Sequence, residues 1–168
     1  ALDVNSGNLV WQSQTINENI FEGSFLLKSS RLVSDEDTIF VSNNQNKFFA
    51  IDSRNGLIKW EQSINSNLEP TIIENLVFTV SMEGYLFIID KLKGNILRST
   101  YIFDNIKNKK IYPSGFVVAK NYIFVSLSNG RILKVEIQDG KTKDIIKIDG
   151  DKISRPYIHN KNMYILRN

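Results

Sequence analysis

The sequence of 168 residues contains no cysteine, one histidine and three prolines. The absence of cysteine excludes disulfides, cysteine-ligated metals and thiol nucleophiles within this segment, and it leaves the cellular compartment open. No apolar run approaches the roughly 18 residues that a membrane-spanning helix needs. Lysine and arginine are scattered rather than blocked, so the net charge of +3 provides no nucleic-acid-binding arm. No segment keeps an apolar period of 3.6 residues, and the sequence therefore predicts no helix.

A short motif recurs four times along the chain. Each copy follows an apolar stretch and consists of an acidic residue, three intervening residues and a glycine. The acid and glycine positions are Asp3 and Gly7, Asp52 and Gly56, Asp90 and Gly94, and Glu136 and Gly140. In the first two copies a tryptophan follows four residues after the glycine, and other residues stand there in the last two; these positions are Trp11, Trp60, Arg98 and Asp144. A motif that recurs in this way along a chain is typical of a repeat architecture.

The segments between the motifs predict β-strands. Runs rich in Ile, Val, Phe and Tyr alternate with turn residues, as in PTIIENLVFTVSMEGYLFIID at residues 70–90 and PSGFVVAKNYIFVSLSNGRILKVE at residues 113–136. Each repeat then holds four short strands in roughly 40–45 residues, which is the pattern of a β-propeller blade. We therefore predict an all-β fold, a β-propeller of four-stranded antiparallel blades. A β-sandwich or barrel is the alternative, and the regular repeat disfavours it.

The repeats divide the chain into successive blades of one partial propeller domain over residues 1–168. A single blade cannot bury both of its faces, so each is expected to stack on its neighbours. The two pieces at the ends of the chain either combine into a fourth blade or belong to a larger ring. The predicted units are a partial blade at residues 1–15, blades at about 24–64, 70–103 and 113–148, and a partial blade at 156–167.

The repeated motif has a simple structural interpretation. The carboxylate that ends the third strand of a blade accepts hydrogen bonds from backbone N–H groups of the following turn. The glycine supplies a position with positive φ in that hairpin. The tryptophan lies on the outer strand and packs across the neighbouring blade, so we expect Trp11 and Trp60 to be largely buried. Where Arg98 and Asp144 replace it, the contact between blades is expected to be weaker or built differently.

The segments ALDVNSGNLVW at residues 1–11 and AIDSRNGLIKW at residues 50–60 resemble the repeat of pyrroloquinoline-quinone (PQQ) enzymes, A-x-D-x-x-x-G-x-x-x-W. Within that superfamily the chain resembles the C-terminal half of the BamB family, the lipoprotein components of the machinery that assembles β-barrels in the outer membrane. The segment SMEGYLFIIDKLKGNIL at residues 81–97 and the ending RPYIHNKNMYILRN at residues 155–168 carry this likeness.

The resemblance to that family implies a propeller ring of seven or eight blades, and we therefore favour the larger ring. It also implies a non-enzymatic scaffold on the periplasmic side of the bacterial outer membrane, without cofactor. Its partner would be the periplasmic domains of the central barrel-assembly subunit. Association with the membrane would require a lipid anchor, and the lipidated cysteine of that family does not occur in this chain.

The sequence contains few candidate catalytic residues. No acid or nucleophile lies at a sequence spacing that indicates a catalytic partner for the single histidine, His159. A position in a turn or at a strand edge is the better interpretation of this residue. The acidic run SDEDT at residues 34–38 lacks the rest of a calcium loop. A fragment of a PQQ-dependent dehydrogenase remains the enzymatic alternative, since another part of such an enzyme would supply the quinone site. A ligand- or stress-sensing propeller is the third class.

One segment is a candidate for binding a protein partner. The sequence DNIKNKKIY at residues 104–112 separates two repeats and is longer than the corresponding connection before Pro70. It combines basic and apolar side chains, which suits a partner with an acidic surface. The candidate residues are Lys107, Lys109, Lys110, Ile111 and Tyr112. A solvated connection is the plainer interpretation of this loop, and strand addition at an exposed sheet edge is a second binding mode.

Overall fold

The computed structural model describes residues 1–15, 27–106 and 110–167, and these residues form strands and turns. No helix long and apolar enough to cross a membrane occurs in those ranges. Three sheets have four strands each, in the orders β1-β2-β3-β4, β5-β6-β7-β8 and β9-β10-β11-β12, and a fourth sheet is the hairpin β13-β14. We call the first three sheets the first, second and third blades.

The strands are short and follow one another along the chain. The first blade contains β1 (Val33–Asp35), β2 (Thr38–Asn43), β3 (Lys47–Asp52) and β4 (Ile58–Gln62). The second blade contains β5 (Thr71–Ile73), β6 (Leu76–Val80), β7 (Tyr85–Asp90) and β8 (Ile96–Tyr101). The third blade contains β9 (Pro113–Ala119), β10 (Tyr122–Leu127), β11 (Arg131–Glu136) and β12 (Thr142–Lys147). The terminal hairpin consists of β13 (Tyr157–His159) and β14 (Asn162–Tyr164).

Equivalent strands of the three blades pair in the same way. All neighbours are antiparallel, and the register between the third and fourth strands shifts by one residue at the same place in each blade. The residue left without a partner at this β-bulge is Lys59, Leu97 or Lys143 in the first, second and third blade. The repeated bulge shows that the repeats in the sequence are equivalent units in space, each bent at its outer strand.

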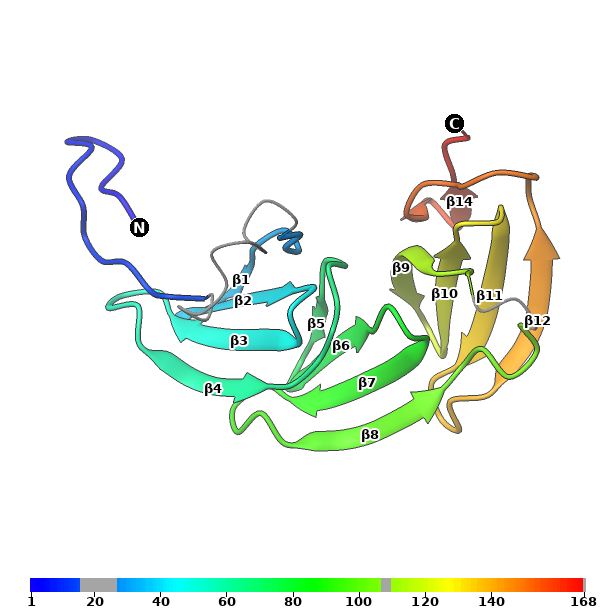
Figure 1. Cartoon of the computed structure of the whole chain (residues 1–168), viewed down its shortest axis with the longest axis horizontal. Coiled ribbons are helices and arrows are strands. Elements are labelled where there is room, and N and C mark those ends of the chain that lie inside the picture. The colour runs from blue at the N-terminus through cyan, green and yellow to red at the C-terminus, as the bar shows by residue number, and fades with distance from the viewer. Residues whose placement is uncertain (16–26, 107–109, 168) are drawn as a thin grey trace.

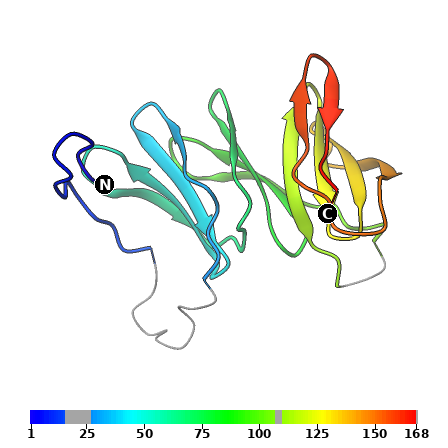
Figure 2. The same cartoon turned by 90° about the horizontal axis from the view of Figure 1, so that it is seen from above.

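The blades stand side by side along an open arc, with the two termini at its opposite ends (Figures 1 and 2). Strands β1, β5 and β9 lie toward the inner side of the arc, and β4, β8 and β12 run along its outer side (Figure 1). This is the arrangement of blades in a propeller. The predicted all-β fold of four-stranded antiparallel blades is therefore confirmed.

The hydrophobic core lies between the blades. One cluster joins the first and second blades, and includes Phe40, Phe48, Trp60 and Ile89. A larger cluster joins the second and third blades, with Phe116 among its fully buried members. Because the middle strands are covered on both faces, five of the six residues of β2 and of β3 are buried. This explains the nearly continuous apolar runs, where a sheet covered on one face would show strict alternation.

Candidate functional site

The acid and glycine of the repeated motif build the turn between the third and fourth strands. In the second blade the Asp90 carboxylate accepts hydrogen bonds from the backbone N–H groups of Leu92 and Lys93, at 3.0 and 2.6 Å. Gly94 follows in the left-handed region, with φ of 73°. The same geometry recurs at the turns of Asp3 and Asp52. These residues thus fix the hairpin through one carboxylate oxygen of each aspartate.

The fourth copy of the motif replaces the aspartate by Glu136. Its carboxylate pairs with the ammonium group of Lys143 at 2.8 Å. The turn is capped instead by Asp139, which accepts a hydrogen bond from the backbone N–H of Lys141 at 2.8 Å. The hydrogen bond from Lys143 also lowers the pKa of Asp139. Gly140 retains a positive φ of 71°, so the backbone of the turn is kept although its acid has moved.

Each tryptophan of the motif spans to the next blade. The indole Nε1 of Trp60 donates to the carbonyl oxygen of Lys91 at 2.9 Å, and its ring covers Gly94. A Cβ atom at Gly94 would lie 2.6 Å from the indole, so the glycine also leaves room for the aromatic ring. Trp11 repeats this contact on the first blade, where its Nε1 donates to Ser53 and its ring covers Gly56. We call each such contact a blade joint.

The joint between the second and third blades is built differently. The guanidinium group of Arg98 donates to the carbonyl oxygens of Ile137 and Gln138, both at 2.6 Å. The space over Gly140 is filled by Thr100, whose hydroxyl oxygen would lie 2.7 Å from a Cβ at that glycine. Two hydrogen bonds from a cation thus replace the tryptophan ring. Asp144, at the same position of the fourth copy, is exposed and accepts a hydrogen bond from the backbone of Ile145.

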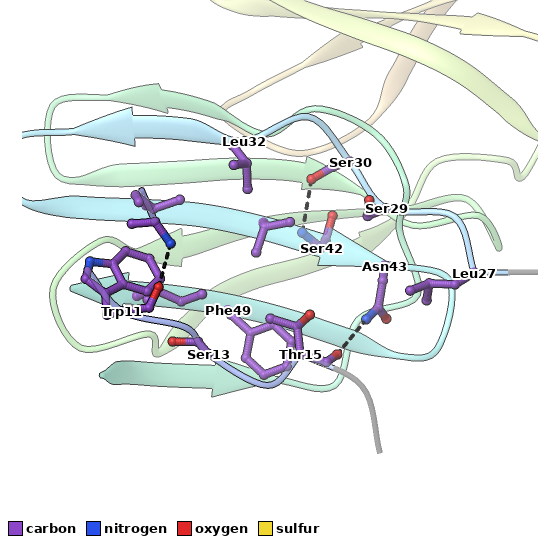
Figure 3. Close-up of a pocket in the computed structure, with 14 residues that line it drawn as sticks. Trp11, Ser13, Thr15, Leu27, Ser29, Ser30, Leu32, Ser42, Asn43 and Phe49 are labelled. Atoms are coloured by element: carbon purple, nitrogen blue, oxygen red, sulfur yellow. Dashed lines mark hydrogen bonds between the residues drawn. The ribbon is translucent and has the colours of Figure 1, made fainter. Parts of the chain in front are cut away.

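The first blade presents a face that no other described blade covers. Trp60 is 8% exposed, whereas Trp11 is only half-buried. Val41, Phe49 and other residues of this face line a cavity of about 510 Å³. Figure 3 shows that Trp11, Ser13 and Thr15 close one side of it. The lining is mainly apolar with serine, threonine and asparagine groups, and it includes no acidic, lysine, arginine or histidine side chain among the described residues.

The turn of the first motif copy also lacks a packed neighbour among the described residues. The glycines at the other three turns each contact a side chain of the preceding repeat. At Gly7 nothing in the described residues lies within 4 Å of the position that a Cβ would take, although its φ of 71° matches the others. The turn therefore has the shape that receives a side chain from another blade, without such a side chain in place.

Only part of the candidate binding loop lies within the described residues. Lys107 and Lys109 lie outside them. Lys110 is exposed, and Ile111 is half-buried against the core between the second and third blades. Tyr112 is 42% exposed, with the ammonium group of Lys152 at 6.0 Å from its ring. Ile111 thus supports the core, and Tyr112 lies exposed beside Lys152.

Two aspartates of the acidic run in the first blade pair with lysines. Asp35 pairs with Lys91 of the second blade at 2.6 Å, and Asp37 pairs with Lys59 at 2.8 Å. The hydrogen bond from Lys59 lowers the pKa of Asp37, and the hydrogen bond to Asp35 raises the pKa of Lys91. In the ranges that the structure describes, no three His, Cys, Asp or Glu side chains gather in a way that could hold a metal ion.

His159 lies at the end of β13 and is exposed. Its ring stacks on that of Tyr157, with centroids 6.4 Å apart and planes at 14°. The backbone of the strand pairs His159 with Asn162 across the turn. No acid or nucleophile is placed by hydrogen bonding to the imidazole in the described residues, so the geometry assigns His159 no catalytic partner.

Several solved structures resemble this one in fold. BamB from Moraxella catarrhalis matches with a TM-score of 0.62 at 15% identity, over 81% of this chain and 42% of that chain. The computationally designed protein Ika4 matches with a TM-score of 0.68 at 10% identity, over 95% of this chain and 98% of that one. Quinohemoprotein alcohol dehydrogenase from Comamonas testosteroni matches with a TM-score of 0.57 at 17% identity, over 69% of this chain and 20% of that chain. At these identities the likeness shows the fold alone.

The sequence has no match among curated proteins. The chain spans about two fifths of the length of the Moraxella catarrhalis structure, as the 42% coverage states. A family model described as outer membrane protein assembly factor BamB, a PQQ-repeat family, matches residues 1–100. This match includes more than half of the 168 residues. The chain therefore belongs to the PQQ-repeat family of outer membrane protein assembly factor BamB.

Proposed function

We propose that this chain is a non-enzymatic scaffold that assists the assembly and insertion of β-barrel proteins into the outer membrane. Its partner would be the periplasmic domains of the central barrel-assembly subunit, and its location the periplasmic side of that membrane. The observation that carries the proposal is the match of the BamB family model to residues 1–100. The blade joints support it, because a rigid stack of blades holds loops in fixed positions for a protein partner.

We further propose that the chain is one part of a propeller ring of seven or eight blades. Residues 1–15 and 156–167 would each contribute half of a blade at the two ends of the arc. Two features of the first blade support this. Its buried face of Val41, Phe49 and Ile51 packs against Trp11 and not against a complete four-stranded sheet among the described residues, and the Gly7 turn lacks an incoming side chain there.

The loop at residues 104–112 is the proposed contact with the assembly subunit. The exposed Tyr112 and the neighbouring lysines offer an aromatic side chain within a basic rim, which fits an acidic partner. The test is a pull-down with the periplasmic part of the assembly subunit. Wild type is compared with a variant in which Lys107, Lys109, Lys110 and Tyr112 are all changed to alanine.

The wild-type chain is expected to retain the assembly subunit, and the loop variant is expected to lose it. A matched control changes three exposed lysines elsewhere to alanine, at Lys93, Lys120 and Lys141. This control separates the loop from a general loss of positive charge. A wild type that does not retain the assembly subunit would refute the scaffold function. A loop variant that binds as well as wild type would refute the role of the loop alone.

A quinone-dependent dehydrogenase is the second candidate, supported by the likeness to quinohemoprotein alcohol dehydrogenase. The described residues do not fit a quinone site with its cation. The carboxylates of Asp35, Asp37 and Asp52 are each held by a lysine or arginine, and no metal-ligating group of three forms among those residues. These three carboxylates are thus engaged within and between the blades, which supports the scaffold proposal.

A further inference from the structure

Strands β1, β5 and β9 begin the three blades on the inner side of the arc (Figure 1), and β13 begins the terminal hairpin. Each of them pairs with the second strand of its sheet in the same way, so positions on and before these strands correspond from sheet to sheet. The residues that correspond on the four strands are Val33, Thr71, Val117 and Tyr157. The segments that lead into the strands can therefore be compared position by position.

Cations recur at two positions of these leading segments. Counted two residues back from the corresponding residues, the chain carries Arg31, Glu69, Gly115 and Arg155. Counted five residues back in the first blade, the third blade and the terminal hairpin, it carries Lys28, Tyr112 and Lys152. At both positions the first blade and the terminal hairpin present a cation, and the third blade between them does not.

These cations line two adjoining cavities. In one cavity, of about 480 Å³, the cations are Lys28 and Lys152. In the other, of about 290 Å³, they are Arg31 and Arg155. The residues that line both cavities are Asn67, Leu68 and Ser114. This shared wall brings the two pairs of cations within reach of one extended ligand.

Arg155 shows that this surface already binds a carboxylate. Its guanidinium Nη1 lies 2.6 Å from the carboxylate of Glu69, and its Nε donates to the carbonyl oxygen of Phe116 at 2.9 Å. Gly115 leaves room for this arrangement, since a Cβ atom at that glycine would lie 2.5 Å from the Cβ of Arg155. The terminal hairpin thus reaches past the third blade to an acid of the second, and that acid occupies the arginine.

The other three cations have no acidic partner within the ranges that the structure describes. Lys28, Arg31 and Lys152 are exposed, and none of them takes part in an ion pair there. Four cations around the single acid Glu69 leave an excess of three positive charges, which equals the net charge of +3 of the whole chain. A concave surface of one sign concentrates its field and attracts ligands of the opposite charge.

We propose that these two cavities, which we call the axial site, bind an extended acidic peptide segment through two of its carboxylates. One carboxylate would lie between Lys28 and Lys152, and the other beside Arg31. A peptide suits the shared wall, because Leu68 would contact the aliphatic part of an acidic side chain and the Asn67 amide would bond to its backbone. The inference goes beyond the proposed function, since it assigns a second docking position whose cations lie outside the loop at residues 104–112.

The test uses a fluorescent eight-residue peptide that alternates glutamate with alanine, and binding is measured by fluorescence anisotropy at low and high salt. The axial variant combines Lys28→Gln with Lys152→Gln, which removes two charges and keeps polar side chains. The matched control combines Lys93→Gln with Lys141→Gln, at exposed lysines in turns of the second and third blades. We expect the axial variant to weaken binding by about tenfold and to reduce its salt dependence, and the control to weaken it by about twofold or less.

A peptide with glutamine in place of each glutamate is expected to bind at least about tenfold more weakly than the acidic peptide, because it offers no carboxylate. Three results would overturn the inference: no salt-sensitive binding of the acidic peptide by wild type, equal weakening in the two double variants, or equal binding of the glutamine peptide. An oligothymidylate of the same charge that binds more tightly, and only with Lys28 and Lys152 present, would also overturn it, because the ligand would then be a nucleic acid.

The pull-down with the assembly subunit separates this inference from the proposed function. A wild type that binds the acidic peptide but does not retain the assembly subunit would refute the scaffold function and leave the axial site standing. A wild type that retains the assembly subunit but does not bind the acidic peptide would refute the axial site alone.

Discussion

Adding one methyl group to a glycine turn tests the blade joints most sharply. Gly94→Ala places a Cβ 2.6 Å from the Trp60 ring at a residue with φ of 73°. The left-handed backbone alone costs an alanine about 1–2 kcal/mol. Displacing the packed indole adds about 1–3 kcal/mol, as in other overpacked cores. We therefore expect Gly94→Ala to lower the free energy of unfolding by about 2–5 kcal/mol.

The chain supplies a matched control for this change. Gly7 has nearly the same φ, at 71°, and nothing described lies within 4 Å of its Cβ position. Gly7→Ala should therefore cost only the backbone contribution, about 1–2 kcal/mol. The difference between the two glycines isolates the contact with Trp60 from the conformational cost of the turn.

A double-mutant cycle measures the same contact from its other side. Trp60→Ala removes a ring that is 8% exposed, stacks on Phe48 at 5.7 Å and donates to the carbonyl of Lys91. Its expected cost is about 3–5 kcal/mol. In the Trp60→Ala background, Gly94→Ala should then cost about 1–2 kcal/mol, since the ring that it would displace is gone. The remaining cost is that of the left-handed backbone.

Urea unfolding followed by far-ultraviolet circular dichroism is the appropriate assay, because the signal does not depend on the tryptophan that is removed. The four proteins of the cycle are compared with Gly7→Ala under the same conditions. Additive costs for Gly94→Ala and Trp60→Ala would refute the packing of the indole on Gly94. A cost for Gly7→Ala as large as that of Gly94→Ala would do so as well.

Three further predictions follow from the site. Arg98→Met removes two charge-assisted hydrogen bonds to backbone carbonyls and should destabilise the chain by about 2–3 kcal/mol in the same urea assay; no loss would exclude Arg98 from the joint. The side-chain hydrogen bond from Arg54 holds the pKa of Asp52 well below its ordinary value of 3.8. The ionised Asp52 therefore stabilises the folded chain above about pH 4, and this contribution is lost as the pH falls. Arg54→Met should raise the pKa of Asp52 and lower the free energy of unfolding at pH 7, and the difference in that free energy between variant and wild type should shrink in acid. Carboxyl NMR and unfolding measured as a function of pH would check this. An Asp52 pKa that does not change in the variant would contradict it. Adding pyrroloquinoline quinone and Ca²⁺ should give no saturable chromophore and no alcohol-dependent dye reduction, and either signal would favour the dehydrogenase.

The fold could be predicted because its signals are local. The acid and glycine of each turn, and the β-branched and aromatic runs between them, lie within a few residues of one another. The repeat then fixes how many strands form a blade, and the motif also placed the tryptophans at contacts between blades. The burial of Trp60 follows that prediction, whereas Trp11 is half-buried because its face has no covering blade among the described residues.

The features that the sequence did not reveal depend on contacts between blades. Gly94 is needed both for its turn and for the ring of Trp60, which is distant in the chain. Arg98 takes over a joint by reaching carbonyl groups of the following blade, and the sequence marked only the missing tryptophan. Ile111 resembled a surface residue beside lysines, but it packs against the core. Such roles appear only when the stacking of the blades is known.

We propose that the chain binds a protein partner and does not process a substrate with a quinone. The most direct measurement is the binding of the chain to an immobilised periplasmic part of the barrel-assembly subunit, with and without pyrroloquinoline quinone and Ca²⁺. The scaffold account predicts saturable binding with one chain per immobilised partner, unchanged by the quinone. The account would be contradicted by the absence of saturable binding, and most strongly if the same sample formed a saturable quinone chromophore.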